Sequence, residues 1–194
     1  HQVEDEFPHR FDVPDEYETI QAAIEEAEDG DIVLVAPGEY IENIDFLGKE
    51  ITVTSHIFFD NNSDFIEQTI IDGNFIDATV QFDSGETINS ILDGFTIING
   101  QDNFYGGGIY CSTYSCANFN NVLVTGNYAS GNGGGIFCES WSEDAVFSNT
   151  VIKENSSDNN GGGIYFNSVN PELSSVSVTQ NHGEFGGGIY FDNS

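Results

Sequence analysis

The heptapeptide YGGGIYC lies at Tyr105–Cys111, and close copies of it recur along the chain. The copies read NGGGIFC at Asn132–Cys138, NGGGIYF at Asn160–Phe166 and FGGGIYF at Phe185–Phe191. Their glycine triplets begin at residues 106, 133, 161 and 186, so the spacings are 27, 28 and 25 residues. A repeat of this length without an alternating helical pattern indicates a solenoid.

A second feature has the same period. A short β-branched run precedes each triplet and ends in an asparagine, at Asn99, Asn127, Asn155 and Asn181. These runs have the composition and alternation of strands. Weaker stretches such as KEITVTS and QTIIDGN predict additional coils before the regular part. The chain therefore predicts an all-β parallel β-helix of roughly seven or eight coils.

Equivalent residues of successive coils should stack about 4.8 Å apart, the spacing of hydrogen-bonded strands. Glycine is expected where the backbone turns sharply or where neighbouring coils approach closely. The repeat predicts an inward apolar stack, an outward aromatic stack and an asparagine ladder in a turn. The apolar stack consists of Ile109, Ile136, Ile164 and Ile189. The aromatic stack consists of Tyr110, Phe137, Tyr165 and Tyr190, and the ladder of the four asparagines above.

The stretch YETIQAAIEEAED predicts a helix near the N-terminus. Its apolar face would contain Ile20, Ala23, Ile24 and Ala27. Asp15 is a suitable N-cap and Gly30 a suitable C-terminal stop. We expect three parts: an extended arm at residues 1–14, a capping helix at residues 15–30 and a β-helix with an uncapped C-terminal end at residues 31–194.

Two interpretations of the uncapped end remain open. The chain could be a piece of a longer solenoid, or its last coil could dock on another subunit and build a fibre by a head-to-tail contact that does not close. The contact residues would then be Phe7 and Phe11 of the arm and Ile189, Tyr190 and Phe191 of the last coil. The arm could equally be a disordered terminus.

The charge is extreme, with 33 Asp and Glu against 3 Lys and Arg and a net charge of −30. Phosphate binding needs clustered basic residues, so nucleic acid and anionic membrane surfaces are excluded as partners.

No apolar run is long enough to cross a bilayer. The chain starts at His1, which fits either removal of a signal peptide or a fragment. These features favour a protein that is secreted, extracellular or on the cell surface.

The stretch YETIQAAIEEAEDGDIVLVAPGEYIENI resembles the start of secreted bacterial right-handed parallel β-helix proteins of the pectin-lyase-like superfamily. ILDGFTIING, followed by the GGGIYC repeats, is similar to their large surface-exposed members and, more distantly, to the chlamydial polymorphic outer-membrane proteins. The chlamydial repeats add a Phe-x-x-Asn tetrad, whereas this chain has Phe119-Asn120-Asn121 and Phe147-Ser148-Asn149. Over residues 15–194 the resemblance implies a right-handed β-helix, in a superfamily that holds lyases, hydrolases and adhesins alike.

The residues give little support to enzymatic chemistry. Lyases of this superfamily use an Arg or Lys base together with Ca²⁺, and the chain offers only Arg10, Lys49 and Lys153. Carboxylates for a hydrolase abound, but polygalacturonase-like signatures such as Gly-His-Gly and Arg-Ile-Lys are absent. The glycine triplets lack the following Lys and helix of a phosphate-binding loop.

A calcium site is the one cofactor site that the sequence suggests. Asp72-Gly73 and Asp93-Gly94 lie 21 residues apart, about one coil. If they stacked, the two carboxylates would repel each other and Ca²⁺ would relieve the repulsion. The alternative is that both pairs are simple turns.

Three cysteines and two sequons complete the candidate sites. Cys111 and Cys138 occupy the same place in successive repeats, so a disulfide could join them, or Cys111 could pair with Cys116. Stacked thiols without a disulfide fit equally well, because later repeats carry Phe at this place. Asn61 and Asn155 begin Asn-x-Ser sequons that would permit glycosylation.

We predict a secreted or cell-surface β-helix without enzymatic activity, whose role is structural or adhesive and whose partners are other copies of itself or surface glycans. The alternative is a polysaccharide-binding or polysaccharide-cleaving module that uses the outward aromatic stack as a sugar platform. Ordinary packing between coils explains the same aromatic residues.

Overall fold

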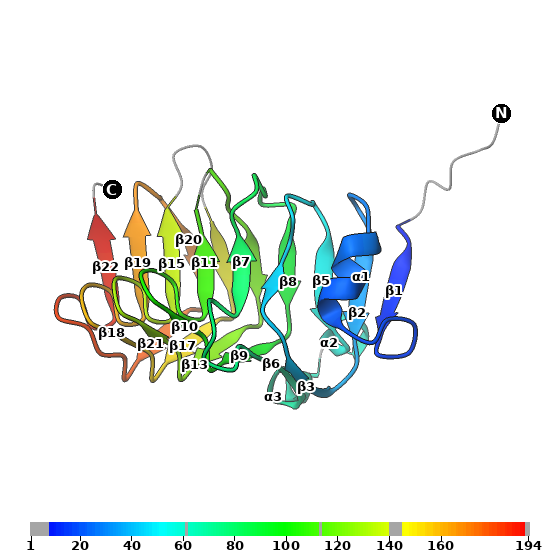
Figure 1. The fold of residues 1–194 in the computed structure, drawn as a ribbon, viewed down its shortest axis with the longest axis horizontal. Coiled ribbons are helices and arrows are strands. Elements are labelled where there is room, and N and C mark those ends of the chain that lie inside the picture. The colour runs from blue at the N-terminus through cyan, green and yellow to red at the C-terminus, as the bar shows by residue number, and fades with distance from the viewer. Residues whose placement is uncertain (1–7, 61, 113, 140–144, 193–194) are drawn as a thin grey trace.

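The computed structural model describes residues 8–60, 62–112, 114–139 and 145–192. Its strands wind around one axis into a parallel β-solenoid, with β1 at one end and β22 at the other (Figure 1). The three long sheets hold seven, six and six strands, and six strands are separated by five steps, so the chain makes about five turns. The expected count of seven or eight coils is not confirmed, because KEITVTS and QTIIDGN form two strands of one turn.

Each turn contributes one strand to each long sheet. The seven-stranded sheet A consists of β1 (Arg10–Val13), β2 (Ile32–Val35), β5 (Thr52–Ser55), β8 (Ile91–Asp93), β12 (Asn118–Asn120), β16 (Val146–Ser148) and β20 (Glu172–Ser174). Sheet B consists of β3 (Gly38–Ile41), β6 (Thr69–Asp72), β9 (Thr96–Ile98), β13 (Leu123–Thr125), β17 (Val151–Lys153) and β21 (Ser177–Thr179). Sheet C consists of β4 (Ile44–Asp45), β7 (Val80–Phe82), β11 (Ile109–Cys111), β15 (Ile136–Glu139), β19 (Ile164–Asn167) and β22 (Ile189–Asp192). The short sheet D consists of β10 (Gln101–Asp102), β14 (Tyr128–Ala129) and β18 (Ser156–Ser157).

The interior is a column of apolar side chains that all three long sheets supply. In sheet A the column contains Leu92, Phe119 and Phe147, which are fully buried on successive turns. The rings of Phe119 and Phe147 stack with centroids 4.8 Å apart, and Phe147 meets Phe166 of sheet C edge-on at 6.0 Å. Each such burial contributes about 1.5–3 kcal/mol, so this column is a main source of stability.

The glycine triplets form the narrow turns that lead into sheet C. Gly133 has φ +71°, which a residue with a side chain rarely adopts. Gly135 has an ordinary φ, but a Cβ atom there would lie 2.6 Å from the carbonyl oxygen of Gly163 on the next turn. The triplets are therefore structural, because one glycine provides the left-handed turn and another permits the close approach of neighbouring coils.

Helix α1 (Ile20–Glu26) is shorter than expected at both ends. Thr19, not Asp15, is its N-cap and accepts a backbone N–H of the first turn at 3.1 Å. Ala27 is the C-cap, ahead of Gly30. The residues that α1 buries are Ile20, Ala23 and Ile24. The helix packs against β1, β2 and β4, and its role as a cap stays a prediction.

Strand β1 corrects part of the expected extended arm. Its residues pair in parallel with β2, from Arg10 opposite Ile32 to Val13 opposite Val35. The ring of Phe11 packs against Tyr17 of the same chain, 5.5 Å between centroids. Residues 10–13 therefore lie on the first coil of their own solenoid, while Phe7 lies outside the described residues.

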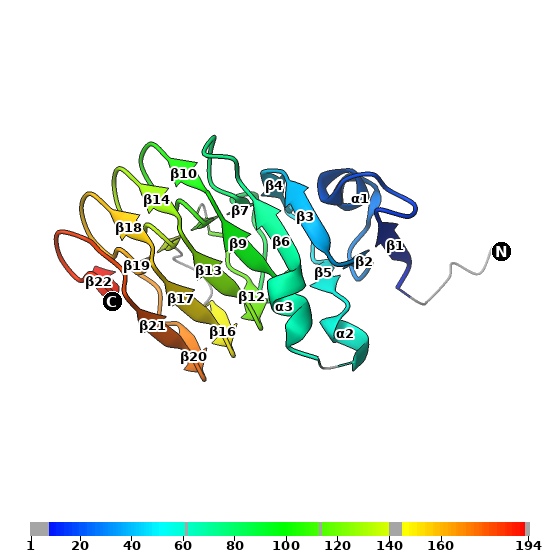
Figure 2. The same ribbon diagram turned by 90° about the horizontal axis from the view of Figure 1, so that it is seen from below.

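Two short helices, α2 (Ile57–Asp60) and α3 (Asp64–Gln68), lie between β5 and β6. Figure 2 shows both on the same flank of the solenoid. The hydroxyl of Thr96 in β9 donates to the carbonyl oxygen of Ile66 in α3 at 2.7 Å. The sequence does not predict these helices, because a single turn is too short to show a helical period.

Candidate functional site

The asparagine ladder forms as a hydrogen-bonded stack of three residues. Asn127 Nδ2 donates to Asn155 Oδ1, and Asn155 Nδ2 donates to Asn181 Oδ1, each at 3.0 Å. The same oxygens accept the backbone N–H groups of Asn127 at 3.0 Å and of Asn155 at 2.9 Å. Asn127 and Asn155 are both 1% exposed, so the ladder lies inside the solenoid wall.

Asn99 is not a member of this ladder, which corrects the prediction. Gly100 takes the equivalent place and donates its N–H to Asn127 Oδ1 at 2.8 Å. Asn99 adopts φ 54° and donates from Nδ2 to Asp72 Oδ2 at 2.9 Å. The run FTIIN is one residue shorter than the later runs. An alignment of the repeats on their asparagines therefore places Asn99 one position too early, and Gly100 is the true equivalent of Asn127.

The isoleucine stack is confirmed. Ile109, Ile136, Ile164 and Ile189 lie opposite one another in sheet C, and the first three are fully buried. The inward face of sheet C therefore belongs to the core and offers nothing to a ligand.

The aromatic stack on the outer face of sheet C forms but is largely covered. Phe137 and Tyr165 stack at 5.3 Å and are only 3% and 5% exposed. The ring of Tyr105 lies 4.6 Å from Phe137. The Tyr165 hydroxyl donates to Asp192 at 2.8 Å, and burial followed by this bond raises the pKa of Tyr165. The middle of the stack therefore cannot serve as an open sugar platform.

The cysteines lie together without a disulfide. Cys111 and Cys138 are opposite each other in β11 and β15, and both are fully buried, as is Cys116. Burial, and then the neighbouring Cys138 thiol, raise the pKa of Cys111. These thiols pack in the core, which agrees with the interpretation of stacked thiols and gives no reactive thiolate.

Asp72 and Asp93 do not come together, so the predicted calcium pair does not form. Asp72 belongs to β6 in sheet B, whereas Asp93 belongs to β8 in sheet A. Asp93 accepts hydrogen bonds from Asn121 at 2.8 Å and Thr54 at 3.5 Å, and burial raises its pKa. Within the described ranges, no group of three or more His, Cys, Asp and Glu residues could hold a metal ion.

The sequons have different outcomes. Asn155 is buried in the asparagine ladder, which rules it out as an accessible glycosylation site in the folded chain. Asn61 lies outside the described residues.

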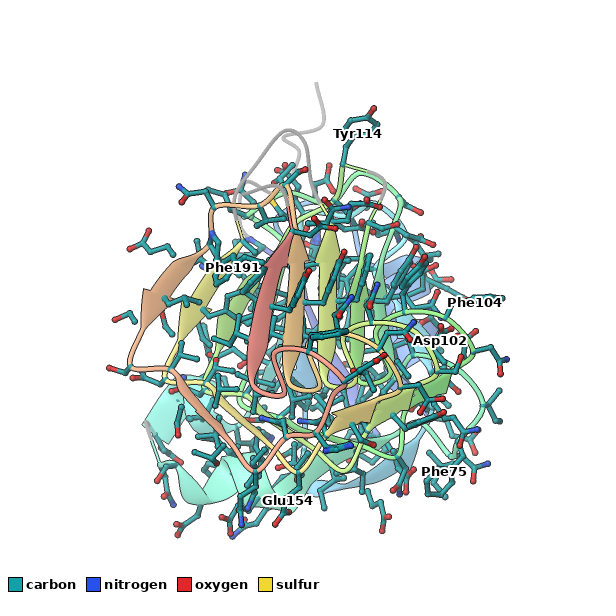
Figure 3. All side chains as sticks on the ribbon, turned by 90° about the vertical axis from the view of Figure 1, so that its left-hand side faces the viewer. Phe75, Asp102, Phe104, Tyr114, Glu154 and Phe191 are labelled. Atoms are coloured by element: carbon teal, nitrogen blue, oxygen red, sulfur yellow. The ribbon has the colours of Figure 1, made fainter. Side chains whose placement is uncertain are left out.

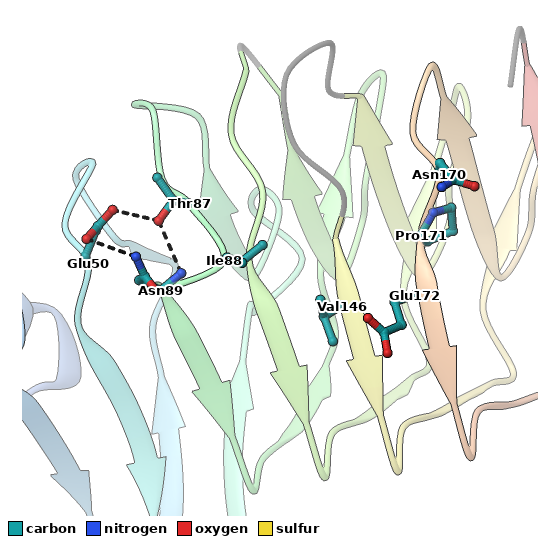
Figure 4. A pocket seen from close by; sticks show the side chains of 8 residues that line it. All are labelled: Glu50, Thr87, Ile88, Asn89, Val146, Asn170, Pro171 and Glu172. Atoms are coloured by element: carbon teal, nitrogen blue, oxygen red, sulfur yellow. Dashed lines mark hydrogen bonds between the residues drawn. The ribbon is translucent and has the colours of Figure 1, made fainter.

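A groove of about 780 Å³ lies where the loops enter the strands of sheet A (Figure 4). At one end, Glu50 accepts hydrogen bonds from Thr87 at 2.7 Å and Asn89 at 3.3 Å. At the other end lie Pro171 and Glu172, and the exposed side chain of Ile88 lies between the two ends. The groove is long, open and mixed in polarity, which suits an extended ligand better than a small one.

A second pocket, of about 290 Å³, opens where the aromatic stack of sheet C begins. Its lining residues are Asp77, Ala78, Gln81, Asp102, Phe104, Tyr105 and Tyr110. Burial raises the pKa of Asp77, and the neighbouring carboxyl group of Asp102 adds to this effect. This carboxyl pair is not among the predicted sites, although its spacing of 25 residues, about one coil, is a signal for it in the sequence.

Two of the three basic residues are engaged in structural contacts. Lys49 Nζ donates to the carbonyl oxygens of Ile24, Glu25 and Ala27 at 2.7 Å each, at the C-terminal end of α1. Arg10 donates to Asp12 at 2.8 Å. The third, Lys153, lies on β17 beside acidic residues of α3.

The last turn exposes side chains whose counterparts one turn earlier are buried. Leu173 is 41% exposed and Phe191 50%, whereas Phe147 and Phe166, their partners in register, are fully buried. Figure 3, viewed along the axis, shows Phe191 on this end face. Ile189 and Tyr190 are half-buried beside it.

Two segments, residues 121–139 and 149–167, match the family described as the Chlamydia polymorphic membrane protein repeat. Each segment contains a strand of sheet B, a ladder asparagine, a glycine triplet and a strand of sheet C. No curated protein matches the chain. Within the described residues, no helix is long and apolar enough to span a bilayer. The chain is thus similar to the chlamydial repeat over two successive turns of its solenoid.

Proposed function

We propose that this chain is a non-catalytic β-solenoid module of a secreted or cell-surface protein, with a structural or adhesive role. The observation that carries the proposal is the match of two successive turns to a repeat described for polymorphic membrane proteins, which suggests a location at the surface or outer membrane. The net charge of −30 suits an exposed surface in a saline or calcium-containing medium, where ions screen self-repulsion.

The engagement of the basic residues supports a non-catalytic role. A lyase base must be free to take a proton from the substrate. Lys49 is held by three carbonyl oxygens and Arg10 by Asp12. Neither residue lines the groove over sheet A or the pocket on sheet C.

The spacing of the carboxyl pair argues against a glycosidase. Glycosidases hold their two carboxyl groups about 5–9.5 Å apart, with the scissile bond or a water molecule between them. Asp77 and Asp102 instead interact directly, because the carboxyl group of Asp102 helps to raise the pKa of Asp77. In the groove, Glu50 belongs to the loop before β5 and Glu172 to β20, several strands away in sheet A.

The purified chain should bind glycans or a cell surface without degrading what it binds. A glycan array and a reducing-end assay on neutral and acidic polysaccharides test both parts. We expect retention on a subset of glycans and no release of product. Release of reducing ends or unsaturated products, abolished by Asp77→Asn or by Glu172→Gln, would establish an enzyme instead.

Head-to-tail assembly is the finer part of the proposal, and Leu173 and Phe191 are its contact residues. Exposed Leu173 and Phe191 would be buried if another subunit continued the stack, because their counterparts inside the solenoid are buried. Negative-stain electron microscopy should show filaments that Phe191→Glu abolishes. Phe75→Glu is the matched control, since Phe75 is 59% exposed and follows β6, which lies four strands away from β21 in sheet B. Dispersed short rods for the unmodified chain would contradict assembly.

A further inference from the structure

The pocket on sheet C has a rigid carboxyl pair on one side. Asp102 lies in β10, and its Oδ1 accepts the backbone N–H groups of Phe104, at 2.5 Å, and of Tyr105. Asp77 Oδ1 accepts the N–H of Ala78 at 2.8 Å. The N–H of Gln101 donates to the carbonyl oxygen of Asp77 at 3.1 Å, which joins the two segments. The carboxyl groups are therefore held together by the backbone on both sides.

This arrangement leaves negative charge without compensation. Asp77 and Asp102 line the same pocket, and neighbouring carboxyl groups repel each other when both are ionised. No Lys or Arg is among the residues that line the pocket, and the chain as a whole carries a net charge of −30. The pocket therefore has a strongly negative potential that favours a cation.

Three of the other lining residues of the pocket are aromatic. Phe104 is 70% exposed and Tyr105 is 41% exposed, and their ring centroids lie 6.4 Å apart. Tyr105 is fixed by its contact with Phe137, and Tyr110 completes the wall. Figure 3 shows Asp102 and Phe104 on the same side of the solenoid. Aromatic faces attract organic cations, and they give no oxygen ligands to a metal ion.

We propose that this pocket binds an organic ammonium group, carried by a small molecule or exposed on a larger one. The ammonium group would lie between the carboxyl pair and the aromatic rings, with Gln81 as a neutral hydrogen-bonding partner. Ca²⁺ fits less well, because it takes six to eight oxygen ligands and three of the seven lining residues are aromatic. A neutral sugar would leave the carboxylate charge uncompensated. The inference does not depend on the adhesive role of the chain.

Calorimetric or NMR titration of the whole chain with choline tests the proposal, with 3,3-dimethyl-1-butanol as the uncharged analogue of the same shape. We expect saturable binding of choline, with a dissociation constant on the order of 1 mM, and at least about tenfold weaker binding of the alcohol. Titration with glucose and with CaCl₂ completes the comparison. Equal binding of choline and the alcohol, no saturable choline binding, or displacement of choline by glucose would overturn the proposal.

Variants locate the site. Asp102→Asn keeps an acceptor for the N–H groups of Phe104 and Tyr105 but removes charge, and should weaken choline binding about tenfold. Phe104→Ala changes an exposed side chain and should weaken it several-fold. Phe75→Ala removes an exposed ring outside the pocket and should leave choline binding unchanged. Circular dichroism confirms that each variant is folded, and equal choline binding by all three folded variants would refute the assignment to this pocket.

Discussion

Replacing Asn155 by Ala should lower the free energy of unfolding by about 3–5 kcal/mol, because this side chain is the centre of the asparagine ladder. Its Oδ1 accepts two hydrogen bonds from Asn127, and its Nδ2 donates to the carbonyl oxygen of Val124 and to Asn181, each at 3.0 Å. Four bonds at about 1 kcal/mol each give about 4 kcal/mol. The N–H of Asn127, which is 1% exposed, would also lose its acceptor.

Urea unfolding followed by far-UV circular dichroism measures this loss. The matched control is Asn159→Ala, the same substitution at an exposed position of the same turn. Because the turns of a solenoid stabilise their neighbours, the denaturant slope should be inspected for separate unfolding of the two halves. An Asn155→Ala variant within about 1 kcal/mol of the control would refute the ladder as a main stabilising element.

Four further outcomes are expected. Gly135→Ala should prevent close stacking of two turns and abolish cooperative unfolding. At Gly126 no atom lies within 4 Å of a new Cβ, so Gly126→Ala should lower the free energy of unfolding by only about 1 kcal/mol in the same urea experiment. Equal losses of stability in the two variants would contradict this. Phe147→Ala should lower the urea-derived stability by about 3–5 kcal/mol, and a loss below about 1 kcal/mol would show that the column is loosely packed. Lys49→Met removes three hydrogen bonds at the end of α1 and should speed amide hydrogen exchange in that helix; unchanged exchange would contradict the role of Lys49. Burial raises the pKa of Asp93 in the folded chain above the ordinary 3.8, so the stability that its protonated form contributes is lost as the pH rises through the raised value. Asp93→Asn should remove this pH-dependent loss in thermal melts. A stability difference between variant and wild type that does not vary with pH would contradict this account.

The repeat predicts much of the fold because its physical causes are local and periodic. The glycine triplet, the alternating isoleucine and the ladder asparagine each recur with the turn, so their stacking follows from one spacing. The shift at Asn99 escaped prediction because a turn residue in the left-handed region can be Asn, Gly, Glu or Gln, as it is at Asn99, Gly126, Glu154 and Gln180.

The candidate site was much less predictable. The outward direction of the aromatic stack follows from strand alternation. Phe137, however, is also covered by Tyr105, whose place in the next two copies of the repeat is taken by Asn132 and Asn160. The carboxyl pair of Asp77 and Asp102 joins a turn before β7 to the first strand of sheet D, and sheet D has no counterpart in the preceding turn. The spacing of 25 residues is a signal for this pair, but contacts between irregular segments follow the period only loosely, so the spacing alone does not single the pair out.

The most direct test of the central claim, that the repeats form stacked turns in register, is a set of nuclear Overhauser contacts in a labelled sample of the whole chain. The structure predicts parallel backbone contacts that link Ile109 to Ile136, Ile136 to Ile164 and Ile164 to Ile189. It also predicts contacts between the side-chain amides of Asn127, Asn155 and Asn181. Contacts at any other spacing, or antiparallel pairs within one repeat, would contradict the solenoid and the surfaces that depend on it.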